Sequence, residues 1–284
     1  MTDDSKTRKP LEELNLLDDF LFGVVLEDKQ NYRDILEIIL EEEVPLLQHA
    51  QMEKVFRYLP VTRNVRMDVV AIDEDNKIYD AEMQMKNTGN LLKRERFYQA
   101  HLDVSLLKPG QVAFDRLNDT CLIMIMPFDL LGKGRYRYTC KIHCVEEPDM
   151  EVEDGTVRIF LNTRGTNPEG VSTELIDFLH YVEHSTSENC ISTGSERIRR
   201  IHDSVQIIKA REDVGVRYMK EWERDHYIRE EAREEGREEG REEERLRLNE
   251  LTKLLLQDER MEDILRGTED LEYQIELLKE YGLY

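Results

Sequence analysis

The chain has 284 residues, with 62 Asp and Glu against 40 Lys and Arg, so its formal net charge is −22. This acidity argues against broad, non-specific adhesion to nucleic acid, which needs clustered cations, but it leaves room for a small basic groove. Because no apolar run is long enough to span a membrane and the first ten residues lack the apolar core of a secretory signal, we expect a cytoplasmic chain with no membrane partner.

Two helices and a short strand are predicted in the N-terminal part. Residues 12–27 form the first helix, where apolar side chains recur at helical spacing, and residues 31–42 form the second. Asp18 and Asp19 are typical helix-capping residues, so we expect them to cap or begin the first helix. A strand that includes residues 55–59 follows.

The most regular pattern lies in residues 65–86, and it predicts a β-hairpin. Apolar residues recur at every second position on both sides of a cluster of turn formers, which is the period that strands show. A three-residue loop at residues 74–76 would place Asn76 in the left-handed region, which asparagine tolerates. That loop pairs Val69 with Ala81 and makes one face of the hairpin wholly apolar. A shift by one residue would mix the two faces.

On the other face, this register sets the carboxylates of Asp68 and Glu82 opposite each other, with Gln84 further along. Like charges directly opposite destabilise a strand pair, so we expect a compensating cation. Paired carboxylates with room for water suit Mg²⁺ or Mn²⁺. The alternative is an ordinary solvated face. Against it stand the opposed charges and the apolar Val70 and Ile72, which indicate that something covers part of this face.

Residues 91–107 form the next predicted helix, which ends at a Lys-Pro-Gly stop signal. Arg94, Tyr98 and His101 fall on one of its faces. From this pattern alone, Arg94 is an ordinary surface residue, Tyr98 packs in the core, and His101 is a partly buried helix residue. If the helix packs beside the end of the hairpin, Arg94 can instead reach a phosphate and Tyr98 can hydrogen-bond it.

Further strands and helices are predicted in the second half of the folded region. Residues 121–126 are continuously apolar, as in a central strand covered on both faces. Cys140 and Cys144 have a C-x3-C spacing that differs from the usual zinc arrangements, so a strand is the better interpretation. The remaining elements are strands at 136–145 and 157–161, and helices at 171–182 and from residue 196 onward.

The composition changes at residue 221, after which charged residues dominate. Arginines recur every four residues from Arg229 to Arg245 with glutamates between them, which predicts an exposed helix supported by Glu–Arg pairs. No apolar stripe runs along this stretch, so it is not a coiled coil by itself. Apolar residues from Leu246 to Leu278 then supply a face that either docks on the chain or makes a homo-oligomer.

The spacing of Asp68, Glu82 and Gln84, D-(x13)-E-x-Q, resembles the motif of the PD-(D/E)xK nuclease superfamily. It is most similar to the Rpn-type branch, the recombination-promoting nucleases and transposases, in which a glutamine commonly replaces the lysine. The resemblance covers residues 11–225, and the charged tail is also typical of that branch. Further matching segments are residues 18–22, 63–68, 94–99, 126–129, 159–163 and 217–219.

The resemblance implies a restriction-endonuclease-like α/β core, with a mixed central sheet flanked by helices, in residues 11–225. A charged helical extension would occupy residues 226–284. The implied activity is that of a Mg²⁺-dependent DNA endonuclease linked to recombination or mobile elements. Asp68 and Glu82 would hold Mg²⁺ or Mn²⁺, with the Met83 carbonyl as a further ligand.

By the same resemblance, Gln84 would orient the attacking water, while Arg94 and Tyr98 would contact the phosphate of bound DNA. An acidic residue of the first helix can join the metal site in this superfamily, but capping stays the expected role of Asp18 and Asp19. Glutamine can act neither as a cation nor as an acid. The alternative is therefore a catalytically weak or inactive nuclease-fold module that acts in DNA or protein binding.

Overall fold

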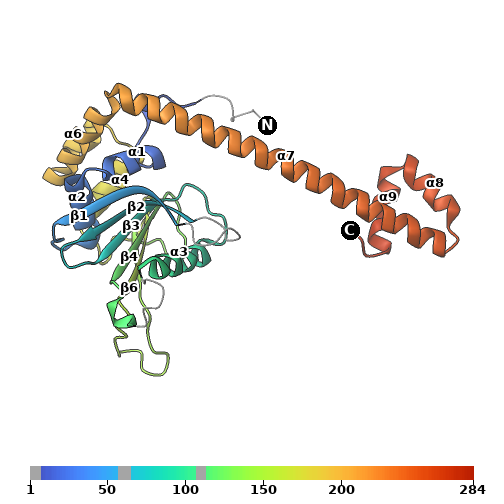
Figure 1. The fold of residues 1–284 in the computed structure, drawn as a ribbon, viewed down its shortest axis with the longest axis horizontal. Coiled ribbons are helices and arrows are strands. Elements are labelled where there is room, and N and C mark those ends of the chain that lie inside the picture. Colours follow the sequence, from blue (N-terminus) through green and yellow to red (C-terminus); the bar gives the residue numbers. More distant parts are fainter. Residues whose placement is uncertain (1–7, 57–64, 107–112) are drawn as a thin grey trace. The chain divides into compact units, whose positions relative to one another are not determined.

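The computed structural model describes residues 8–56, 65–106 and 113–284. Contacts divide the chain into two compact units, Met1–Tyr218 and Met219–Tyr284. The first unit is an α/β domain built on one mixed sheet (Figure 1), and the second is helical. The expected division at residue 225 stays a prediction.

The sheet has six strands in the order β1-β2-β3-β4-β6-β5. The three strands β1, β2 and β3 form an antiparallel meander, β4 and β6 continue it in parallel, and β5 pairs antiparallel with β6 at the edge. Because β3 and β4 run parallel, the chain has to cross the sheet between them, and the segment that contains α3 makes this crossover connection. The strands are β1 (Leu47–Phe56), β2 (Val65–Asp73), β3 (Ile78–Met83), β4 (Thr120–Met126), β5 (Arg137–Cys140) and β6 (Thr156–Asn162).

The predicted hairpin and its register are confirmed where β2 pairs with β3. Val69 pairs with Ala81 and Ala71 with Tyr79, as the three-residue loop requires. Asn76 has a φ of 64°, in the left-handed region. The Asp73 carboxylate accepts hydrogen bonds from backbone amides within the turn, which fixes the loop locally.

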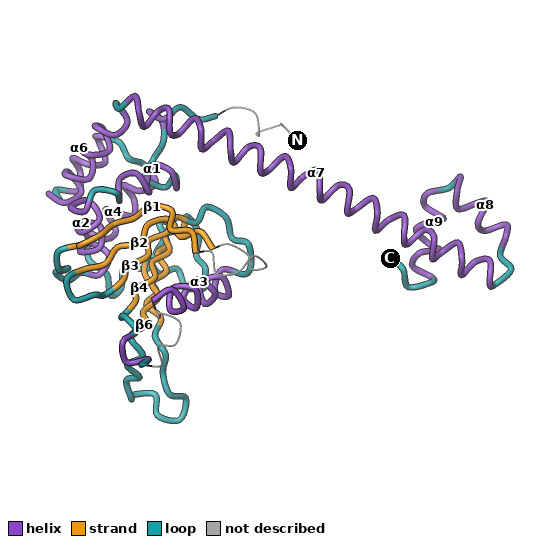
Figure 2. Tube along the Cα trace, viewed as in Figure 1, coloured by secondary structure: helices purple, strands orange, loops and turns teal. Residues whose placement is uncertain are grey.

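Helices cover both faces of the sheet, so alternate residues of each strand enter different cores (Figure 2). One face packs against α1, α2, α4 and α6, with Ala81 and Ile123 among its buried residues. The other face packs against α3, where Leu102 meets Val70 and Leu122. The predicted cover over part of the polar hairpin face is therefore α3. The helices are α1 (Asp19–Leu26), α2 (Lys29–Leu40), α3 (Leu91–Leu106), α4 (Thr173–Glu183), α5 (Ser187–Thr193) and α6 (Glu196–Lys209).

The first helix begins later than residue 12, so that prediction was wrong at its N-terminal end. Asp18 caps α1 by accepting a hydrogen bond from the Leu21 amide. The preceding Leu17 donates its amide to the Val182 carbonyl at 3.0 Å, and Leu11–Glu13 form a separate 3-10 turn. This tertiary hydrogen bond to α4 thus takes the place of a helical one. The capping role of Asp18 is confirmed.

The predicted strand at 136–145 is also too long, because β5 ends at Cys140. Beyond it the chain leaves the sheet edge, and a single bridge joins His143 to Glu151. The predicted strand at 121–126 is confirmed as the fully buried β4, between β3 and β6. The predicted strand at 55–59 corresponds to the end of a longer β1, and its last residues lie outside the described part of the chain.

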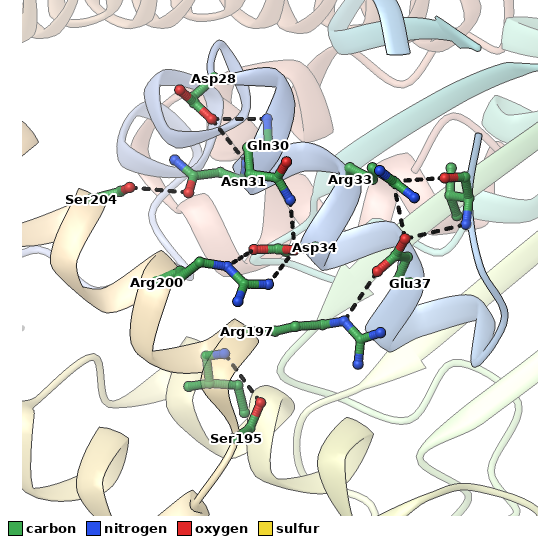
Figure 3. A network of polar contacts seen from close by, with 12 residues as sticks. Asp28, Gln30, Asn31, Arg33, Asp34, Glu37, Ser195, Arg197, Arg200 and Ser204 are labelled. Carbon is green, nitrogen blue, oxygen red and sulfur yellow. Dashed lines mark hydrogen bonds and ion pairs between the residues drawn. The ribbon is translucent and has the colours of Figure 1, made fainter. Parts of the chain in front are cut away.

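An ion-paired network joins α2 to α6 (Figure 3). Arg200 binds Asp34 with two parallel contacts, from Nε and from Nη2, each 2.8 Å long. Asp34 is only 1% exposed, and Gln30 also donates to it at 3.0 Å. A buried carboxylate keeps its charge only when it is paired and hydrogen-bonded, so this network holds α6 on α2.

Replacing Arg200 with methionine is expected to destabilise the first unit by about 2 kcal/mol, because it leaves the buried Asp34 with too few donors. The half-exposed position of Arg200 keeps the effect below that of a fully buried pair. Urea denaturation measures it. The matched control is Arg199→Met, an exposed neighbour that donates to the Gly194 carbonyl. Equal stability of the two variants would contradict the role of the Asp34 pair.

The second unit contains most of the 46-residue helix α7 (Glu212–Gln257), followed by α8 (Met261–Glu269) and α9 (Leu271–Glu280). Its charged stretch is an exposed helix with Glu–Arg pairs, such as Arg245 with Glu242 at 2.6 Å. Leu251, Leu255 and Leu277 are buried against one another, so apolar residues of the tail dock within this unit. Self-association stays a prediction. Within the described ranges, every helix is either too short or too polar to cross a membrane.

Candidate metal and nuclease centre

Glu82 lies near the end of β3, on the sheet face that α3 covers. Every residue of β3 is buried, because β2 and β4 flank it and helices cover both of its faces. Glu82 pairs with Met124 across the sheet and is 8% exposed. The strand ends one residue later, and Gln84 follows it, half-buried. The buried carboxylate of Glu82 therefore lies two residues before the side-chain amide of Gln84, at the end of β3.

Arg94, in the first turn of α3, joins these two groups. Its Nη2 donates to Glu82 Oε1 at 2.7 Å and to Gln84 Oε1 at 2.5 Å. The Gln84 amide nitrogen donates to the Lys86 carbonyl at 2.5 Å. The structure thus brings together three of the predicted site residues, Glu82, Gln84 and Arg94.

Burial raises the pKa of Glu82 to about 7. The Arg94 guanidinium lowers this pKa, while the carboxylates of Glu95 and Asp19 raise it further. Asp19, at the start of α1, therefore contributes negative potential at Glu82. Near pH 7, keeping the Glu82 carboxylate ionised costs free energy because it is buried, and a bound divalent cation would offset that cost.

The carboxylate of Glu82 offers a donor of the kind that a hard divalent cation takes. Glu82 Oε2 is buried and has no hydrogen-bond partner, so one carboxylate oxygen keeps its lone pairs available. Carboxylate and carbonyl oxygens are the ligands that Mg²⁺ and Mn²⁺ prefer. Among the side chains that the structure describes, no three acidic, His or Cys residues gather into a metal site. The predicted site also needs Asp68, whose side chain lies outside that set.

The other predicted ligands are placed by their strands. Asp68 belongs to β2 and directly precedes Val69, which pairs with Ala81, the neighbour of Glu82. Met83 is the last residue of β3, and its side chain is buried on the opposite face from Glu82. The roles of Asp68 and of the Met83 carbonyl remain predictions.

Tyr98 lies one turn after Arg94 on α3 and is half-buried beside Leu102 and its neighbours. The Arg94 guanidinium carbon is 5.6 Å from the centre of its ring. Tyr98 therefore packs in the core, as the pattern alone predicted, and also supports the Arg94 guanidinium. His101 lies further along the helix, with its ring against that of Phe97.

Sequence reasoning missed Glu95, the neighbour of Arg94. Glu95 is 3% exposed, and burial raises its pKa to about 7, although the nearby Arg94 and Arg158 lower it. No pattern marked this residue, because helical periodicity in α3 mixes charged and apolar positions. The one available signal was its helical spacing from Leu91 and Leu102, which puts it on the same side of α3 as these two buried residues.

The six-stranded mixed sheet with flanking helices is a restriction-endonuclease-like α/β fold. A buried glutamate near a strand end, engaged by a helix arginine, is consistent with a nuclease-type centre in such a fold. The chain belongs to the PD-(D/E)XK nuclease family transposases, whose family model matches residues 18–235. No curated protein and no solved structure gives a significant match to it. Membership of this family supports a nuclease-type or mobile-element role.

Proposed function

We propose that this protein is a divalent-metal-dependent DNA endonuclease that acts in recombination or in the movement of mobile elements. One observation carries the proposal. The Glu82 carboxylate is buried near the end of β3 with an oxygen that lacks a hydrogen-bond partner. Asp68 belongs to the neighbouring strand β2 and directly precedes Val69, which pairs with Ala81. With the Asp68 carboxylate opposite Glu82, the two would form the acidic half of a phosphodiester-cleaving site.

The residues of the chain divide the work between them. Asp68, Glu82 and the Met83 carbonyl would hold Mg²⁺ or Mn²⁺. When bound, such a metal acidifies a water and neutralises the charge that builds on the phosphate. Gln84, beside Glu82, would orient the attacking water through its amide. Arg94 and Tyr98, on α3, would bind the phosphate oxygens of DNA.

The substitution Asp68→Ala tests the proposal directly. We expect the wild-type chain to nick supercoiled plasmid DNA in the presence of Mg²⁺, and the variant to lose that activity because the metal loses one of its two carboxylates. Conversion to the open circle is followed on agarose gels, with a parallel reaction in a chelator. Nicking by the variant at the wild-type rate would refute the assignment.

A second candidate is a nuclease-fold module that binds DNA or protein without efficient cleavage. Two observations favour it. Gln84 stands where the wider superfamily has a lysine, and its amide oxygen is engaged by Arg94. Calorimetry separates the candidates, because only the nuclease requires Mg²⁺ or Mn²⁺ binding that disappears when Asp68 or Glu82 is neutralised.

A further inference from the structure

A single nitrogen of Arg94 holds both groups that the proposed chemistry needs. Nη2 donates to Oε1 of Glu82, the proposed metal ligand whose other oxygen has no hydrogen-bond partner, and to Gln84 Oε1, the proposed water-orienting atom. Gln84 is held at its other end as well, because its amide nitrogen donates to the Lys86 carbonyl. While Arg94 stays in this position, the Gln84 oxygen already has a cationic donor, which competes with a water for that oxygen.

The geometry of this contact suits release. Arg94 uses one nitrogen for both acceptors, and its buried Nε has no hydrogen-bond partner. The structural pair Arg200–Asp34 is different, because it uses two nitrogens on two oxygens, as Figure 3 shows. Parallel two-point contacts are stronger and more specific than contacts from one nitrogen. The Arg94 side chain also remains 25% exposed.

We propose, on the basis of the proposed metal site, that Arg94 and the divalent metal compete for Glu82. A dication and a guanidinium that share one partly buried carboxylate repel each other strongly, because the dielectric there is low. Metal binding then releases the Arg94 guanidinium from Glu82 and Gln84. The freed cation is available to the DNA phosphate, and the freed amide oxygen is available to the water. Arg94 thereby couples metal loading to substrate binding.

The competition is reciprocal: if metal binding weakens the contact between Arg94 and Glu82, then that contact weakens metal binding by the same factor. Removing the Arg94 cation must therefore tighten metal binding, even in the absence of DNA. A residue that only contacts substrate would leave metal affinity unchanged, and a residue that helps to hold the metal would weaken it when removed. Metal affinity without DNA consequently distinguishes the proposed role from both of these.

The test is isothermal titration calorimetry of Mn²⁺ into the full chain, without DNA. We expect Arg94→Gln to bind Mn²⁺ at least roughly fivefold more tightly than the wild type. The matched control is Arg96→Gln, which removes the same charge from an exposed position of the same helix. We expect its affinity to equal that of the wild type. Circular dichroism of each variant confirms that it is folded.

A second variant, Arg94→Lys, keeps the cation, and we expect it to bind Mn²⁺ more weakly than Arg94→Gln does. Binding that Glu82→Gln abolishes but Arg94→Gln leaves unchanged would overturn the competition and leave the proposed nuclease centre standing. Equal tightening in Arg94→Gln and Arg96→Gln would overturn it as well, because a general field effect would then suffice. Absence of Glu82-dependent binding in every chain would overturn the proposed function itself.

Discussion

Replacing Glu82 with glutamine is expected to lower metal-dependent DNA cleavage on the order of 10³-fold. Glutamine has the same shape but no charge, so it cannot balance a divalent metal. The initial rate of plasmid nicking at saturating Mg²⁺ measures the loss. Calorimetry with Mn²⁺ should show the binding heat disappear in the same variant, which ties the lost rate to the lost ligand.

The same substitution should leave the fold intact. Burial already raises the pKa of Glu82 to about 7, so near neutral pH the protonated form, which glutamine mimics, is well populated. Asp103→Asn is the matched control, since it neutralises a carboxylate further along α3 that accepts from Gln99. We expect that control to cleave at the wild-type rate. Cleavage by Glu82→Gln within a few-fold of the control, roughly the effect of a neutral surface change, would rule out a metal-ligand role.

We expect Glu95→Gln to raise the free energy of unfolding relative to the wild type, by about 3 kcal/mol more at pH 8 than at pH 4. Glu95 is 3% exposed and its pKa is raised from 4.5 to about 7, chiefly by burial. The folded state therefore binds the proton more tightly than the unfolded chain does. Stability from this group is fully present below pH 4.5 and is lost as the pH rises through 7.

Urea denaturation between pH 4 and pH 8 measures this difference. Glutamine cannot ionise, so the variant keeps its stability where the wild type loses it. Glu82 has a similarly raised pKa, and the Glu95 carboxylate raises it further, so the variant also lowers the pKa of Glu82, which adds to the expected stabilisation at high pH. Glu188→Gln, at an exposed position of α5, should show no such pH dependence. A variant less stable than wild type at pH 8 would mean that electrostatic attraction by Arg94 and Arg158 outweighs the cost of burial.

The hairpin could be predicted almost completely, because its determinants are local. Side-chain alternation identifies the two strands, and the loop with Asn76 in the left-handed region fixes which residues pair. The position of Glu82 on the polar face of β3 follows from that register. The fully buried strand β4 could be predicted for the same reason, since its run of apolar side chains needs no distant information.

The partners of Arg94 could not be predicted in this way. The start of α3 at residue 91 could be predicted, but the segment between Gln84 and Arg94 has no regular pattern, so the sequence does not say how the helix lies on the sheet. Packing of α3 on the sheet, through Leu102 against Val70, decides that Arg94 reaches Glu82. The start of α1 was missed for a similar reason, because the Leu17 amide of the preceding segment donates to α4 instead of to its own chain neighbours.

By itself, the sequence determined the hairpin, its register and the ordered motifs that indicate a PD-(D/E)XK nuclease, since these depend on neighbours along the chain. The tertiary structure alone decided the electrostatics of the centre. Burial beneath α3 raises the pKa of Glu82, and Asp19 and Glu95 come from distant segments to raise it further. Charge interactions depend on distance and desolvation in space, and neither can be read from spacing along the sequence.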